Sequence, residues 1–90
     1  MTSETRDTLL EFPCRFPVKA MGRRSPAFEA LVREMICAHA RPYPDEPLRT
    51  RASKDGHYVS VTVVIEAESQ QQLDAIYRAL TESDQVLLAL

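Results

Sequence analysis

Hydrophobic and polar residues alternate with a period of two along four segments of this chain, and two other segments carry hydrophobic residues every three or four positions. The alternation predicts strands with one buried face, and the longer period predicts amphipathic helices. The most regular alternation lies in the third strand, where Val59, Val61, Val63 and Ile65 point to one side. The expected strands are residues 14–22, 48–52, 58–66 and 85–90, and the expected helices start at Ser25 and Ser69.

Local signals mark where these elements begin and end. The Ser25 hydroxyl can accept a backbone N–H and Pro26 suits the first helical position, so the first helix is predicted to begin there. It is predicted to end near Ala40, because the residue before Pro42 is pushed out of helical geometry. Two further signals are a hairpin turn at Asp55-Gly56 and a capping box formed by Ser69 and Gln72.

Six elements in this order predict an α+β fold, a ferredoxin-like βαββαβ sandwich. Its four-stranded antiparallel sheet has the order 4-1-3-2, and both helices lie on one face. The first and third strands are central because their alternation is strongest. Ninety residues form one domain; we expect it to span residues 11–90, after a flexible N-terminal segment 1–10.

This arrangement leaves one sheet face without a helix, called the open face below. Val86, Leu88 and Leu90 of the last strand are expected to point the other way, toward the helices. Apolar residues on an uncovered face favour a partner, although an antiparallel sheet can also face water. The residues expected on the open face are Lys19, Met21, Arg49, Arg51, Tyr58, Ser60, Thr62, Val64 and Leu87.

The loop after the first strand is a candidate anion site. Arg23 and Arg24 precede Ser25 at a predicted helix N-terminus, where free N–H groups and positive charge converge. Acylphosphatases share this architecture and use an arginine in this loop together with an asparagine. The chain contains no asparagine and no glycine-rich cradle, so we expect no such catalysis. The alternative is a pair of solvated arginines.

Nucleic-acid binding is the least favoured function. RNA-recognition modules of this architecture stack bases on aromatic residues of the central strands. Tyr58 is the one aromatic side chain expected on the open face, because Phe16 should point into the core.

Charge is uneven along the chain. Residues 15–54 carry nine Lys and Arg against four Asp and Glu, and residues 55–90 carry one against six. Such asymmetry can steer partners. The N-terminus lacks the basic start and apolar stretch of a secretory signal, and no apolar run could span a bilayer. We therefore expect a cytoplasmic protein without membrane association.

No pattern of metal or catalytic residues emerges. Cys14 and Cys37 form no CxxC pair and are expected to be reduced, mostly buried thiols. His39 is expected at the boundary of the first helix and His57 in the turn, so three converging metal ligands are missing. We expect no cofactor, no metal and no enzymatic activity.

Short motifs spread over nearly the whole chain after residue 8 are shared with a group of known proteins. They are Glu11-Phe12-Pro13, Phe16, Lys19, Met21-Gly22, His39-Ala40, Pro42, Gly56, Tyr58, Ser60-Val61, Gln72, Tyr77, Leu80, Val86 and Leu90. On these residues the chain resembles the YbeD-like family of small bacterial proteins, a family similar in fold to the ACT regulatory domain, which binds small ligands. The resemblance implies this fold, carries over nothing catalytic, and implies that any regulation acts in trans.

These observations predict a non-enzymatic regulatory or protein-interaction module that acts through its open face or an edge strand. The partner is an unidentified protein, and a homodimer is one form of the interaction. The alternative is a small-ligand or anion sensor that uses Arg23, Arg24 and Ser25.

Overall fold

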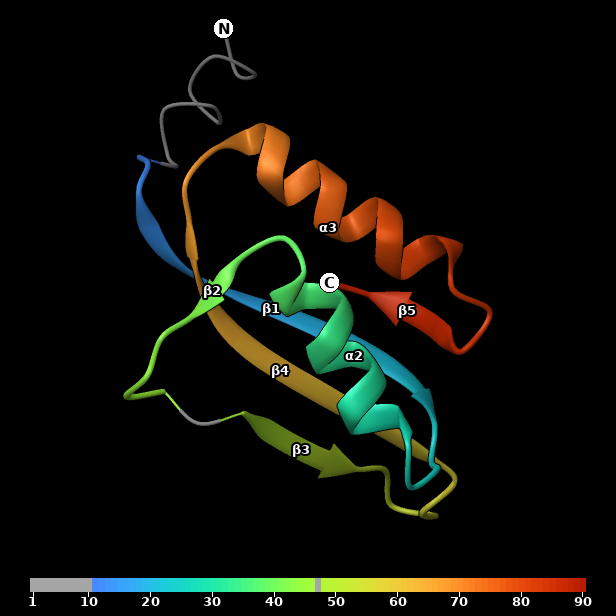
Figure 1. Ribbon diagram of the computed structural model, residues 1–90. Helices are drawn as coiled ribbons and strands as arrows, with labels where there is room; N and C mark the ends of the chain where they lie inside the picture. The colour runs from blue at the N-terminus through green and yellow to red at the C-terminus, as the bar shows by residue number, and fades with distance from the viewer. Residues whose placement is uncertain (1–10, 47) are drawn as a thin grey trace, which may run out of the picture.

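The computed structural model describes residues 11–46 and 48–90, which contain two helices and five strands (Figure 1). The predicted flexible segment 1–10 lies outside the described residues. The elements are β1 (Cys14–Arg23), α2 (Phe28–Cys37), β2 (Arg41–Pro42), β3 (Arg49–Ala52), β4 (Tyr58–Ala67), α3 (Gln70–Glu82) and β5 (Val86–Ala89).

The sheet is antiparallel, and β1 and β4 are its central pair. They pair from Cys14 opposite Ala67 to Arg23 opposite Tyr58. β5 pairs with the free side of β1, and β3 pairs with the free side of β4. The order β3-β4-β1-β5 is the predicted one for these four strands.

The prediction of four strands was wrong, because β2 adds a fifth. Arg41 lies opposite Glu66 and Pro42 opposite Ile65, beside β3 on the same edge of β4. The sequence predicts a loop here because of Pro44 and Pro47, and a proline such as Pro42 cannot donate to a strand ladder. At a sheet edge the missing donor matters little, and the Tyr43 N–H donates to the Val64 carbonyl at 3.0 Å to complete the pairing.

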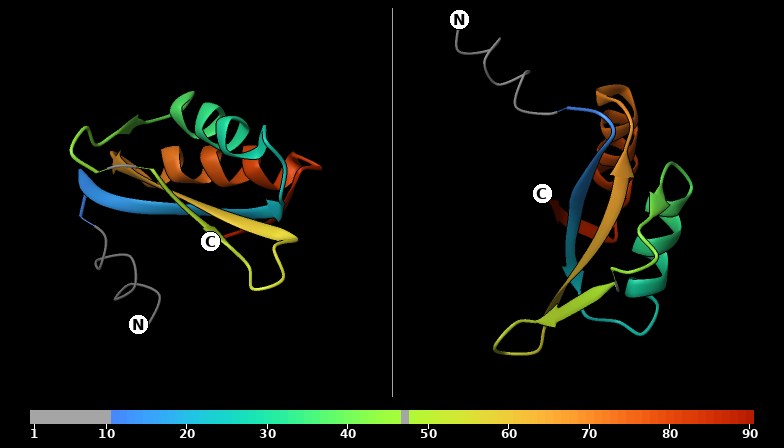
Figure 2. Two further views of the ribbon diagram at one scale, coloured as in Figure 1. Left: turned by 90° about the horizontal axis from the view of Figure 1, so that it is seen from below. Right: turned by 90° about the vertical axis from the view of Figure 1, so that its left-hand side faces the viewer.

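Both helices lie on the same face of the sheet, and the core fills the space between (Figure 2). The alternation in β1 and β4 turns Val18, Ala20, Val61 and Ile65 toward the helices, and all four side chains are fully buried. The helices contribute one buried stripe each: Phe28, Val32 and Ile36 from α2, and Leu73, Ile76 and Leu80 from α3.

Helix α2 is shorter than predicted at both ends. Its N-cap is Ala27, without a side-chain hydrogen bond, so the prediction of a Ser25 cap was wrong. Ser25 instead belongs to a preceding turn, in which its carbonyl accepts from the Phe28 N–H at 3.3 Å. Cys37 lies outside the buried stripe of α2, so its thiol is exposed, contrary to the prediction, while Cys14 is partly buried.

Helix α3 begins at the predicted cap. The Ser69 hydroxyl accepts from the Gln72 N–H at 3.0 Å. The Gln72 side chain accepts from the Glu68 N–H at 2.7 Å and donates to the His39 carbonyl at 3.0 Å. This one glutamine therefore joins the start of α3 to the turn that follows α2.

Strand β5 contains a bulge that reverses the predicted facing of its leucines. Val86 lies opposite Gly22, but Leu88 lies opposite Met21, so Leu87 is the extra residue. Leu88 therefore shares the open face with Met21, and it is 47% exposed. Leu90, two residues after Leu88, exchanges two backbone hydrogen bonds with Lys19 of the open face. The predicted burial of Leu88 and Leu90 was wrong because a bulge breaks the period of two.

Gly22 sits where β1 approaches both α2 and β5. A Cβ atom built there would meet the Phe28 ring and lie 2.5 Å from the Gln85 carbonyl oxygen.

We expect Gly22→Ala to lower the free energy of unfolding by about 2 kcal/mol, the typical cost of forcing extra volume into a packed site. Urea denaturation measures this. Ser25→Ala, in an exposed turn, is the control and should change stability by less than about 0.5 kcal/mol. Equal stability of the two variants would contradict the close contact.

Tyr77 ties α3 to the end of the chain. Its hydroxyl donates to the Leu90 carbonyl at 2.7 Å, and burial raises the pKa of the phenol above its ordinary value of 10.0. We expect Tyr77→Phe to cost about 1 kcal/mol at pH 7. A raised pKa favours the neutral phenol in the folded state. The stability that the Tyr77 hydroxyl contributes is therefore complete below pH 10 and is lost as the pH rises further.

Urea denaturation at pH 7 and pH 11 tests this difference. The stability gap between wild type and Tyr77→Phe should narrow at pH 11. Tyr58→Phe, whose side chain is exposed, should show no comparable gap at pH 7. A constant gap for Tyr77→Phe would contradict the role of its hydroxyl.

Candidate functional site

The open face is built from two rows of side chains that cross the sheet. In one row Leu88, Met21, Ser60 and Arg51 lie opposite one another on β5, β1, β4 and β3. In the next row Lys19, Thr62 and Arg49 lie opposite one another, beside Leu90. Each row thus passes from an apolar residue at one edge to an arginine at the other.

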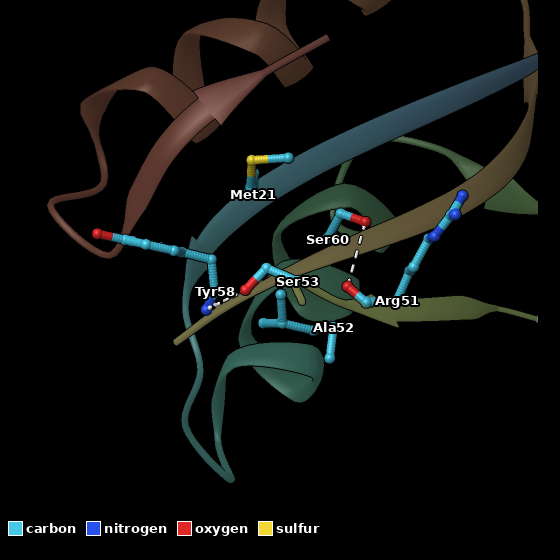
Figure 3. Close-up of a pocket in the computed structure, with 7 residues that line it drawn as sticks. Met21, Arg51, Ala52, Ser53, Tyr58 and Ser60 are labelled. Carbon is cyan, nitrogen blue, oxygen red and sulfur yellow. Dashed lines mark hydrogen bonds between the residues drawn. The ribbon is translucent and has the colours of Figure 1, made fainter. Parts of the chain in front are cut away.

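The first row opens into a mainly apolar hollow of about 300 Å³, called the Met21 pocket. Figure 3 shows Met21, Ser60 and Arg51 together on this face, with the Tyr58 ring turned away from β3. Ser53 and Ala52 close the side formed by β3 and its turn. The pocket is lined by Met21, Arg51, Ala52, Ser53, Tyr58, Val59 and Ser60.

The second row forms a basic hollow of about 520 Å³, called the Lys19 groove. Its lining is Lys19, Arg49, Thr50, Arg51, Ser60 and Thr62, so it shares Arg51 and Ser60 with the Met21 pocket. Among the residues that the structure describes, no acidic residue lines either hollow. Arg49 lies 3.8 Å from Glu46, whereas Lys19 and Arg51 form no ion pair within the described residues.

A network of hydrogen bonds fixes the turn between β3 and β4. Asp55 accepts from the Ser53 hydroxyl at 2.6 Å and from the His57 N–H at 3.0 Å. These bonds lower the pKa of the Asp55 carboxyl, and the bond from the Ser53 hydroxyl has the larger effect. Gly56 takes the positive φ that the turn requires, 78°, which confirms the predicted hairpin. Ser53 and Tyr58 are thereby held at the rim of the Met21 pocket.

The loop before β3 is anchored by Arg15. Its guanidinium lies 4.3 Å from the centre of the Tyr43 ring and donates to Glu46 at 2.6 Å. Glu46 also faces Arg49, the first residue of β3. On the opposite side of β3, the Thr50 hydroxyl donates to Glu29 of α2 at 3.1 Å. These contacts position the strand that carries the two arginines of the open face.

The structure brings together seven of the nine residues predicted for the open face. Val64 does lie on this face, between Pro17 on one neighbouring strand and Tyr43 on the other side. Only 7% of the surface of Val64 is exposed. It is therefore not available to a partner. Leu87 is exposed but belongs to the bulge, so Leu88 takes the place opposite Met21. Alternation alone gave no signal for Leu88, because it predicted the opposite facing.

The predicted anion site is only partly assembled. Arg23 and Arg24 line a hollow of about 450 Å³ with Gly56, His57 and Tyr58. The Arg24 N–H donates to the His57 carbonyl at 2.9 Å, which joins the loop to the hairpin. Ser25 does not line this hollow, and α2 begins three residues after it. The arginines thus face the β3–β4 turn instead of the helix N-terminus.

Within residues 11–46 and 48–90, no cluster of three or more His, Cys, Asp and Glu side chains could hold a metal ion. Over the same residues, neither helix combines the length and the apolar composition needed to cross a membrane.

Comparison with known proteins gives a family and a fold. The family model described as "Protein of unknown function (DUF493)" matches residues 7–90. A UPF0250 protein of Neisseria gonorrhoeae is 44% identical over 97% of this chain and 96% of its own length. The UPF0250 protein NE1487 of Nitrosomonas europaea is 37% identical over 96% of this chain and 99% of its own.

A solved structure also has a similar fold. The solution structure of protein HP0495 from H. pylori matches with a TM-score of 0.66, covering 90% of this chain and 85% of that one. The two sequences are 15% identical, so the likeness concerns the fold alone.

Proposed function

The chain belongs to the DUF493/UPF0250 family of small bacterial proteins, the YbeD-like family, and we propose that it is a non-enzymatic regulatory or interaction module. It binds a partner protein through the open face, in the cytoplasm, and acts on that partner in trans. The likeness of such folds to the ACT regulatory domain supports a regulatory role by analogy.

The observation that carries this proposal is the pairing of an apolar pocket with a basic groove on a sheet face that neither helix covers (Figure 2). Around the pocket, Leu88 is 47% and Tyr58 39% exposed. A face that only contacts water gains nothing from such residues. Protein interfaces combine apolar contact at the centre with charged groups that steer the partner and set the register.

Charge reversal on the open face tests the proposal. Tagged wild type and the variant Lys19→Glu/Arg51→Glu are used to capture partners from a lysate of the organism that encodes the chain. We expect the variant to weaken capture of a specific protein by roughly tenfold or more. Gel filtration with light scattering shows whether that partner is a second copy of the chain.

The matched control carries the same charge change on the other side of the molecule. Arg33→Glu/Arg78→Glu alters exposed residues of α2 and α3 and should capture the partner as wild type does. If both double variants lost capture of the partner equally, or both retained it equally, a role for the open face would be contradicted.

The second candidate function is anion sensing at the hollow formed by Arg23, Arg24 and His57, since two arginines face one cavity there. Titration with inorganic phosphate, followed by amide chemical shifts, should move Arg24, Gly56 and His57. Arg23→Gln/Arg24→Gln should abolish these shifts and leave those of Lys19 and Thr62 unchanged. Absence of shifts in wild type at millimolar phosphate would dismiss this function.

A further inference from the structure

We propose that the open face recognises an extended, acidic segment of a partner protein in which an apolar side chain and a carboxylate stand two residues apart. This inference rests on the proposed function and gives the chemistry of the partner. The apolar side chain enters the Met21 pocket, and the carboxylate lies in the Lys19 groove between Lys19, Arg49 and Arg51.

The spacing follows from the register of the sheet. Met21 and Lys19, Ser60 and Thr62, and Arg51 and Arg49 are each two residues apart on their own strands, and the members of each row lie opposite one another. Two residues of a strand span roughly 7 Å. Alternate side chains of an extended segment laid along β4 have the same repeat. A side chain that lies above the pocket therefore places the side chain two residues away from it above the groove.

The two hollows suit different side chains, and the Met21 pocket suits the apolar one. The Met21 pocket holds about 300 Å³, at the lower end of the range for ligand sites, roughly 300–1,000 Å³, which suits a single side chain. Met21 supplies a flexible thioether that adapts to different apolar shapes. Apart from Arg51, which the pocket shares with the Lys19 groove, the lining is mainly apolar and offers few partners to a charged group.

The Lys19 groove selects an anion. Two guanidinium groups and one ammonium group line it, together with the hydroxyls of Ser60 and Thr62. Arg49 also lies near Glu46, whereas Lys19 and Arg51 have no acidic partner among the residues that the structure describes. An arginine fork binds a carboxylate through two parallel hydrogen bonds, which adds geometric selectivity to charge. Because Arg51 and Ser60 line both hollows, the two parts of the ligand must be close together.

The observations favour a peptide over a nucleic acid. A nucleic-acid strand carries a phosphate at every nucleotide and needs aromatic side chains for its bases. Here the cations of the face lie beside an apolar pocket, and within residues 11–46 and 48–90 Tyr58 is the one aromatic residue that lines either hollow. In a second copy of the chain the exposed carboxylates of α3 do not offer this spacing, because they lie on a helix, where residues two apart point in different directions.

The test is a titration of the full-length protein with short blocked peptides, followed by amide chemical shifts. The reference peptide carries leucine and glutamate at alternate positions in a Ser/Gly background, in both sequence orders. We expect shifts at Met21, Lys19, Ser60 and Arg51. Replacing the glutamate by glutamine, the leucine by serine, or moving the two to adjacent positions should weaken binding roughly tenfold.

Two protein variants separate the site from general charge effects. Arg51→Gln should weaken binding of the reference peptide, and Arg33→Gln, on the exposed side of α2, should not. Equal binding of the adjacent-position peptide would overturn the proposed spacing. Larger shifts of the same residues with an oligonucleotide of matched length would overturn the choice of a peptide.

Failure of this inference can be distinguished from failure of the proposed function. If capture of the partner depends on Lys19 and Arg51 but none of the peptides shifts the open face, the spacing rule is wrong and the docking surface stands. If capture is indifferent to both residues, neither proposal survives.

Discussion

The antiparallel pairing of β1 with β4 is the constraint on which the rest of the structure depends. Its register runs without a break from Cys14 opposite Ala67 to Arg23 opposite Tyr58. Because side chains alternate between the two faces, this one register decides which residues enter the core and which form the open face. A slip by one residue would move Val61 to solvent and Thr62 beneath the helices. The cost of burying such polar groups keeps Lys19 and Thr62 together on the uncovered side.

The edges of the sheet depend on more local contacts, and they supply much of the candidate site. On one side the Arg15 anchor and the bond between Thr50 and Glu29 position β3. On the other side Gly22 allows close approach of Phe28 and Gln85, and Tyr77 bonds the last residue after β5. These edge strands bring an arginine and a leucine to opposite ends of the same row.

Most of the fold could be predicted from the sequence, because the two central strands and both helices carry clear periodic patterns. Local chemistry also predicted the Ser69 cap and the turn at Gly56, which the structure confirms. The errors lie where periodicity gives no information. The β5 bulge exchanges Leu87 for Leu88, and Pro42 pairs at an edge where its missing donor costs little. The candidate hollows likewise need residues from separate elements, such as Ala52 and Met21, which no local pattern relates.

The folded sheet also gives the charge asymmetry of the chain a direction. The basic stretch, residues 15–54, includes both β1 and β3, and their outward residues Lys19, Arg49 and Arg51 meet on the open face. The acidic stretch, residues 55–90, includes α3, on the opposite side of the sheet, where Asp74 and Glu82 are exposed. A chain of net charge -2 can thus present a basic surface on one side. In the interaction that we propose, such separation orients the acidic partner toward the open face before contact, at distances comparable with the Debye length of roughly 8–10 Å. In the same proposal selectivity depends on the apolar pocket, because charge alone distinguishes poorly among acidic segments.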